Sequence, residues 1–159
     1  MTNDDVLKFS SHDLSIFCYG GVSDVYVEYA HTGHDFFVGL VAPDKAPEDE
    51  ARFPNSTSGS YVTFAGPVIV RWTARDGSKL DASIDLDPIF SDRAVLHSQD
   101  PGRIYQPAPI VGKSPTILVE VNDRCVSIYL LVTLKLVKEP EHNRFEIREN
   151  RTLAFSRSY

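Results

Sequence analysis

The most regular pattern of apolar and polar positions lies between Thr116 and Val137, where two apolar runs are separated by a polar turn at residues 122–124. In the first run, apolar residues alternate with a second set that includes Glu120, which is typical of a strand. In the second run, both alternating sets are apolar from Tyr129 to Val132. We therefore predict a central β-hairpin whose second strand is covered on both sides there, or has a sandwich core on one side and a loop on the other.

Short apolar or alternating segments, separated by turn residues, recur along the rest of the chain. Asp76-Gly77 lies between two of them, and Asp-Gly flanked by alternating residues is a strong sign of a hairpin. Residues 31–35 and 139–143 are predicted as turns. The further strands are predicted at residues 6–9, 14–19, 22–30, 36–41, 61–65, 68–74, 80–86 and 151–158.

This spacing predicts an all-β fold, because no segment sustains the apolar periodicity of a helix. We expect a single-domain antiparallel β-sandwich of about 8–10 short strands, with minor helix or 3-10 turns in its loops. The domain is predicted to span residues 1–159. Proline and glycine mark two long surface loops, at about residues 42–60 and 98–115, and a helical turn is expected to begin near Pro47.

Composition narrows the classes of partner. The formal net charge is −6, which argues against nucleic acid because binding to the phosphate backbone requires basic residues. No apolar run approaches the roughly 18 residues that a membrane span needs, and the acidic start does not resemble a signal peptide. We therefore expect no membrane partner and a cytoplasmic location. The two cysteines, in apolar surroundings, are expected to be buried hydrophobes.

One group of residues could bind a metal ion. His31, His34 and Asp35 form an H-x-x-H-D pattern, and two imidazoles with a carboxylate can fill three positions around zinc or iron. The favoured interpretation is that they are polar turn residues before a strand. We predict no metal and no other cofactor, and keep these three residues as the candidates for a metal site.

Two other groups could give a ligand-binding sandwich. Carboxylates at a sandwich edge can bind calcium, although strand alternation explains most of them here without a metal. The acidic residues are Asp81, Asp85, Asp87 and Asp92. Aromatic rings can stack on sugars or line a protein interface, although core packing explains most such rings. The aromatic residues are Trp72, Tyr26, Tyr29, Tyr61 and Tyr105.

The preferred hypothesis is a non-catalytic protein-binding module, because the sequence holds no recognisable phosphate-binding, zinc-protease or hydrolase motif. We expect a small acidic immunity or inhibitor protein that neutralises a bacterial toxin or effector by binding a basic surface of it directly. The predicted partner-binding residues are Asp44, Glu48, Asp49, Glu50, Asp85, Asp87 and Asp92. The alternatives are a carbohydrate- or calcium-binding module, and a metal-dependent enzyme that uses His31 and His34.

Overall fold

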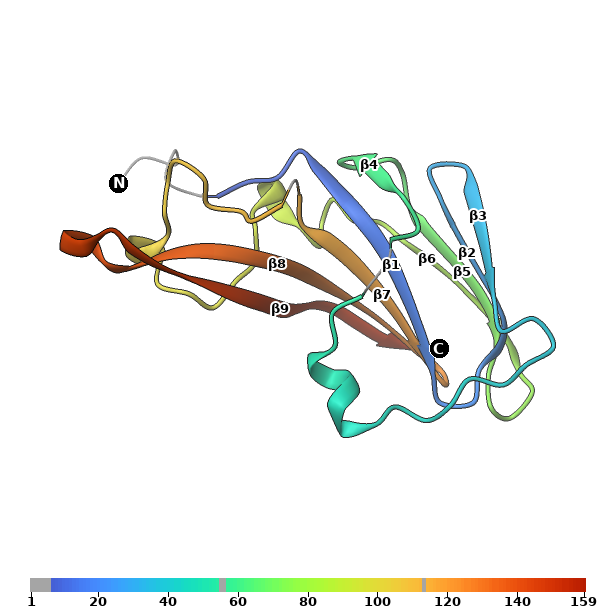
Figure 1. Ribbon diagram of the computed structural model, residues 1–159. Coiled ribbons are helices and arrows are strands. Elements are labelled where there is room, and N and C mark those ends of the chain that lie inside the picture. Colours follow the sequence, from blue (N-terminus) through green and yellow to red (C-terminus); the bar gives the residue numbers. More distant parts are fainter. Residues whose placement is uncertain (1–6, 55–56, 113) are drawn as a thin grey trace.

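The computed structural model describes residues 7–54, 57–112 and 114–159, which form two β-sheets packed face to face (Figure 1). One sheet has five strands in the order β4-β1-β7-β8-β9, and the other has four in the order β3-β2-β5-β6. The prediction of an all-β sandwich is confirmed. Residue 6 of the first predicted strand and residues 55–56 and 113 of the two predicted loops lie outside the described residues.

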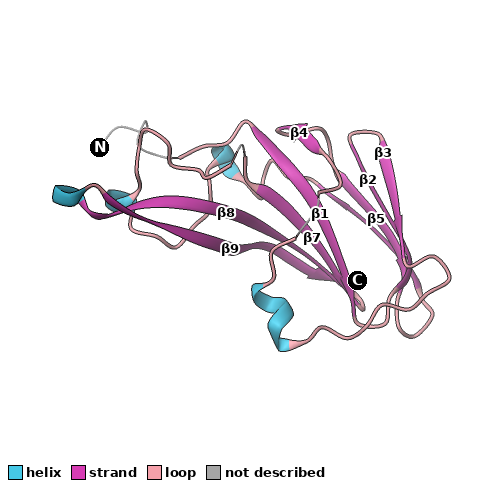
Figure 2. Ribbon diagram, viewed as in Figure 1, coloured by secondary structure: helices cyan, strands magenta, loops and turns pink. Residues whose placement is uncertain are grey.

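Within the described residues, strands dominate and the helical segments are short 3-10 turns (Figure 2). The strands are β1 Ser11–Tyr19, β2 Ser23–Tyr29, β3 Thr32–Phe36, β4 Ser60–Val62, β5 Val68–Thr73, β6 Lys79–Ile84, β7 Thr116–Asn122, β8 Cys125–Glu139 and β9 Arg144–Ser158. The 3-10 segments are η2 Pro47–Ala51, η3 Ser91–Arg93, η4 Pro101–Arg103 and η5 Pro140–His142. No helix among the described residues has the length and apolar character needed to cross a membrane.

The predicted central hairpin is confirmed as β7 and β8, which pair antiparallel around a tight turn at Asp123 and Arg124. β9 then runs back along the full length of β8. On the other side of the hairpin, β1 lies beside β7, with Leu14 opposite Ile117. The five-stranded sheet is therefore built around the segment in which the hydrophobic pattern is most regular.

The pairing of β1 with β7 is parallel, whereas the sequence predicted an antiparallel sandwich. Every other strand pair of the two sheets is antiparallel among the described residues. A parallel pair needs a long crossover connection, and here that connection contains the whole four-stranded sheet. Alternation along a strand shows which face is buried, but it does not show the direction of the neighbouring strand.

The four-stranded sheet consists of two antiparallel hairpins placed side by side. In the β5–β6 hairpin, Gly77 adopts a positive φ of 88°, as the predicted Asp-Gly turn requires. In the β2–β3 hairpin, Ala30 and His31 form a two-residue turn with φ values of 52° and 60°. Residues 32–35 therefore belong to a strand, and the prediction of a turn over residues 31–35 holds only at its beginning.

The strand predicted at residues 36–41 is wrong. Phe36 ends β3, and Phe37 adopts a positive φ of 52° that turns the chain out of the sheet. The N–H of Leu40 donates to the carbonyl of Phe37, which closes a turn, and Val38, Leu40 and Val41 are exposed. An apolar run alone predicted a strand here, but no neighbouring strand pairs with this segment.

The inner faces of the two sheets meet in an apolar core that also encloses one histidine. His12 is fully buried, with Nδ1 3.1 Å from the carbonyl of Asp13 and Nε2 2.9 Å from the hydroxyl of Tyr29. Nδ1 must carry the proton because its neighbour can only accept, so Nε2 accepts from Tyr29. Burial lowers the pKa of His12, although the carbonyl and charge of Asp13 oppose this, and the imidazole is neutral in the core.

Candidate functional site

The outer face of the five-stranded sheet is partly covered by the first long loop, and we call this region the covered face. Leu118, Tyr129 and Leu131 project outward from β7 and β8 and form a small apolar cluster, against which Phe17 and Phe53 pack. The sequence predicted a loop as one of two possible covers for β8, because both sides of that strand are apolar. The structure confirms this alternative, since Phe53 belongs to the loop.

Four charged residues meet on the covered face. Lys45 of the loop places Nζ 2.8 Å from Glu120 Oε1 on β7 and 2.6 Å from Glu50 Oε2 in η2. Arg151 of β9 places Nη2 3.6 Å from the same Glu120 oxygen, and its guanidinium lies 4.2 Å from the centre of the Tyr129 ring. The side chains of Glu120 and Arg151 are only 5% and 9% exposed, so the loop, β7 and β9 are joined by a largely buried ion network.

The network also fixes the loop in one position. Burial alone would lower the pKa of Lys45, but its hydrogen bonds to Glu120 and Glu50 outweigh burial and raise that pKa. The same contact with Lys45 lowers the pKa of Glu50. In addition, Arg151 Nη1 donates to the carbonyl of Arg52 at 3.0 Å. Because a buried charge is costly without its partner, these contacts hold residues 45–53 against the outer face of the sheet.

A pocket of about 400 Å³ opens beside this network, between the loop and the outer side of β9. It is lined by Glu50, Ala51, Phe53, Tyr129, Glu149, Arg151 and Leu153. The side chain of Glu50 is 64% exposed, and Glu48 is also exposed on the same 3-10 turn. The lining combines apolar side chains with the carboxylates of Glu50 and Glu149, which suits a lysine or arginine side chain, because its long stem is apolar and its head is positively charged.

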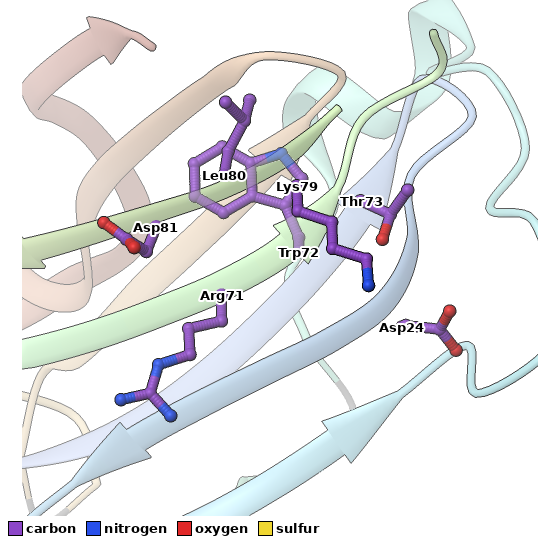
Figure 3. A pocket seen from close by; sticks show the side chains of 7 residues that line it. All are labelled: Asp24, Arg71, Trp72, Thr73, Lys79, Leu80 and Asp81. Atoms are coloured by element: carbon purple, nitrogen blue, oxygen red, sulfur yellow. The ribbon is translucent and has the colours of Figure 1, made fainter. Parts of the chain in front are cut away.

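A second pocket, of about 330 Å³, lies on the outer face of the four-stranded sheet (Figure 3). Its charged residues are Asp24, Arg71, Lys79 and Asp81, so acids and bases are balanced. Arg71 and Asp81 lie directly opposite each other on β5 and β6. Opposite charges at directly facing positions are ordinary cross-strand pairs of a solvated sheet. The charges of this pocket are therefore explained by strand pairing on an exposed face. The charges of the covered face differ, because Glu120 and Arg151 are largely buried.

The predicted partner-binding acids fall into two groups at opposite ends of the sandwich. Asp44 forms an ion pair with Arg75 in the β5–β6 turn, whereas Asp85 follows the far end of β6, about 20 Å along that strand. Asp49 accepts from the N–H of Ala46 within the loop. The first group is Asp44, Glu48, Asp49 and Glu50, and the second is Asp85, Asp87 and Asp92. The seven acids therefore do not form one surface.

The candidate metal ligands do not converge. His31 is exposed in the β2–β3 turn, and His34 lies opposite core residue Val27 on the inner side of β3. Asp35 is the next residue of the strand and projects to the other side, because successive side chains alternate. Among residues 7–54, 57–112 and 114–159, no three His, Cys, Asp or Glu side chains are grouped as metal ligands, and this includes the four aspartates considered for calcium.

The candidate aromatic residues do not form a platform for a sugar. Trp72 and Tyr29 are buried in the core, and the indole N–H of Trp72 donates to the carbonyl of Asp123. Tyr26 lies over Gly33 on the outer face of the other sheet, while Tyr105 packs against Phe145. Tyr61 packs edge-on against Tyr29, with ring centres 4.8 Å apart, at the border of the core. Packing therefore accounts for the rings, and the five do not gather on one surface.

Sequence reasoning missed Lys45 and Arg151, and it placed Glu120 on a strand face without giving it a role. The signal for Glu120 was present, since it is a carboxylate within an otherwise apolar strand. The identity of its partners was not, because Lys45 is distant in sequence and Arg151 belongs to a different strand. No protein-family model matches the sequence, and no curated protein or solved structure matches the chain.

Proposed function

We propose that the chain is a non-catalytic protein-binding module, and that it binds a basic surface of its partner through η2 and the adjoining pocket of the covered face. The observation that supports this proposal is the position of Glu50, an exposed carboxylate that lines the pocket with Phe53 and Leu153; Glu48 is exposed on the same 3-10 turn. In this arrangement, a lysine or arginine of the partner places its stem against Phe53 and Leu153, and its charge meets Glu50.

The buried network gives this surface a physical advantage. A loop that is already ordered loses less conformational entropy when it binds, so less of the interaction free energy is spent on ordering. Lys45, Glu120 and Arg151 hold residues 45–53 against the sheet before any partner arrives. The net charge of −6 also speeds encounter with a basic protein.

The finer proposal is an immunity or inhibitor protein that neutralises a bacterial toxin or effector. Enzymes that act on nucleic acid or other anionic substrates carry basic active sites, and an acidic module can block such a site directly. The second acidic group, beyond the end of β6, lies on a different part of the molecule and serves as an internal control for simple charge attraction.

The test compares two matched double variants as baits in a lysate of the source cells. In the first variant, Glu48→Gln and Glu50→Gln remove two carboxylates of η2, of which Glu50 lines the pocket. In the second, Asp85→Asn and Asp87→Asn remove two at the other end of the sandwich. We expect the unmodified chain to capture one basic protein, the first variant to bind it at least tenfold more weakly, and the second to bind it within about twofold.

Affinity is then measured with the purified partner by calorimetry at two salt concentrations, after urea unfolding has shown that both variants are folded. Equal loss of affinity in the two variants would show that general charge attraction, and not a site at η2, accounts for binding. Capture of no protein at all would refute the proposal. For the finer proposal, co-expression of the chain must relieve the toxicity of the captured protein; binding without relief would reject the inhibitor role.

A further inference from the structure

The C-terminal strand β9 forms a long open edge of the five-stranded sheet. It is fifteen residues long and pairs with β8 on one side, and it lies at the end of the strand order (Figure 1). Among the described residues no strand pairs with the outer edge of β9, and the carbonyl of Arg148 accepts from the side chain of Asn150 at 3.2 Å. The backbone groups of such an edge can pair with another strand. Proteins block such edges with charged side chains, and β9 carries both arginines and glutamates.

The outward side chains of β9 have an order that becomes self-complementary on reversal. Ile147, Glu149, Arg151 and Leu153 follow one another on the outer face, opposite Lys135, Thr133, Leu131 and Tyr129 of β8. Ile147 is 60% exposed and Leu153 is 54% exposed, although both are large apolar residues. The order is thus apolar, acidic, basic, apolar. When a second copy of the strand runs antiparallel to the first, each acidic position lies opposite a basic one and each apolar position opposite an apolar one.

We propose that two copies of this chain associate through β9, antiparallel, around a two-fold axis at Asn150. In this register Glu149 of each copy lies opposite Arg151 of the other, and Ile147 lies opposite Leu153. The exposed aliphatic side chains are then covered in pairs, and residues 146–154 of the two copies form about eight main-chain hydrogen bonds. The two five-stranded sheets become one continuous sheet.

Other registers are less favourable for a simple reason. Directly opposite residues in an antiparallel pair share a face, so the two-fold axis must pass through a residue position. An axis at Arg148, Glu149 or Arg151 places a charged residue opposite its own copy, which is destabilising. An axis at Ile147 or Thr152 leaves Glu149 opposite a phenylalanine. Asn150 is the position at which both the charges and the aliphatic residues are matched.

The guanidinium of Arg151 is directed away from the open edge. Its Nη1 donates to the carbonyl of Arg52, and its Nη2 faces Glu120 on β7. In the proposed register the exposed Glu149 therefore lies opposite the backbone and stem of Arg151, and the aliphatic contact is made by Ile147 and Leu153, which are both exposed in the single chain.

This inference goes beyond the proposed function and does not depend on it. The loop that bears Glu48 and Glu50 lies over β1, β7 and β8, on the side of Arg151 away from the open edge. Glu149, Arg151 and Leu153 line the pocket and also belong to the proposed contact, so in the dimer each pocket lies at the seam between the two copies. A chain that captures no basic partner could still form this dimer, and a monomer could still bind the partner.

The first test measures mass in solution by sedimentation, at protein concentrations from about 1 to 500 µM, a range that brackets the affinity of a small interface. We expect the unmodified chain to reach twice the 17.8 kDa of one copy. Ile147→Arg should shift this equilibrium at least tenfold toward the monomer. Val62→Arg is the matched control, because Val62 is an exposed apolar residue on β4 at the opposite edge of the same sheet, and it should leave the dimer intact.

The second test determines the register by cross-linking with a short bismaleimide at neutral pH. The background carries Cys125→Ser, and Cys18 is inert because burial raises the pKa of its thiol to about 12. A mixture of Ile147→Cys and Leu153→Cys chains should cross-link, because these positions face each other across the axis. Ile147→Cys alone should not, because the two copies of residue 147 are about 20 Å apart.

The results that would overturn the proposal are equally direct. A chain that remains monomeric over the whole concentration range refutes the dimer. A dimer that Ile147→Arg and Val62→Arg affect equally, or that cross-links through Ile147→Cys alone as readily as in the mixture, or in neither sample, refutes the β9 pairing around Asn150. Circular dichroism confirms that each variant is folded, and exposed positions were chosen so that the substitutions leave the core untouched.

Discussion

The outer faces of the two sheets show how one loop changes the chemistry of a sandwich. The four-stranded sheet presents Arg71 and Asp81 to solvent as a cross-strand pair of opposite charge. The five-stranded sheet presents Tyr129 and Glu120, and residues 45–53 bury them. On both sheets, alternate side chains of each strand point outward. Only on the five-stranded sheet are some of these outward side chains buried by a loop.

Burial, and not composition, determines how much the ionic groups of the two faces contribute to stability. Exposed pairs contribute little because water and salt screen them. Charges taken out of water must keep their partners, so the same residue types become structural requirements beneath the loop.

The largest effect is expected from Glu120→Gln. The substitution keeps the shape of the side chain but leaves the charges of Lys45 and Arg151 without their common carboxylate, so the free energy of unfolding should fall by about 3 kcal/mol. Asp81→Asn on the exposed face should change it by less than about 0.5 kcal/mol. Urea unfolding measures both. Equal effects would show that the loop does not isolate the network from water.

A smaller effect is expected from Phe53→Ala, which removes the ring that anchors the loop to the apolar cluster. Because Phe53 is only half-buried, we expect a loss of about 2 kcal/mol, and faster amide exchange at residues 45–53. The matched control is Ile69→Ala, a half-buried residue on the outer face of β5, which should cost about 1 kcal/mol. Unchanged exchange in the loop would contradict the anchoring role.

The smallest effect concerns pH. Contact with Lys45 lowers the pKa of Glu50 below its ordinary value of 4.5 in the folded chain, so the unfolded chain binds a proton first as the pH falls. The stabilisation by Glu50 is therefore complete above pH 4.5 and is lost below it. The difference in urea midpoint between the unmodified chain and Glu50→Gln should narrow from pH 6 to pH 3. A constant difference would mean that the ion pair is not formed in solution.

Local patterns predicted much of the fold because turns and strands are determined mainly by residues close together in the sequence. The Asp76-Gly77 hairpin and the β7–β8 hairpin are determined by turn residues and alternation, and both are confirmed. The apolar outer side of β8 even predicted its loop as one of two covers. The turn at Ala30 and His31 was placed imprecisely because alanine is not a typical choice for a positive φ, so the start of the turn at Ala30 gave no signal.

The candidate site was less accessible to prediction, because it depends on which distant segments meet. The acidic loop was recognised by composition, but its acids and those after β6 were treated as one group, and the sandwich separates them. Lys45 and Arg151 were ordinary surface charges in the sequence. They become part of a site only when the loop crosses the sheet and reaches Glu120.

The parallel pairing of β1 and β7 has a consequence for the synthesis of the chain. Leu14 and Ile117 are about 100 residues apart, and closing a loop of that length costs about 4 kcal/mol of chain entropy. Before β7 is made, the only strand of its own sheet that β1 can pair with among the described residues is the three-residue β4. β7 leaves the ribosome about 5–20 s after β1 at usual elongation rates, so most of the apolar length of β1 stays without its main neighbour for that time.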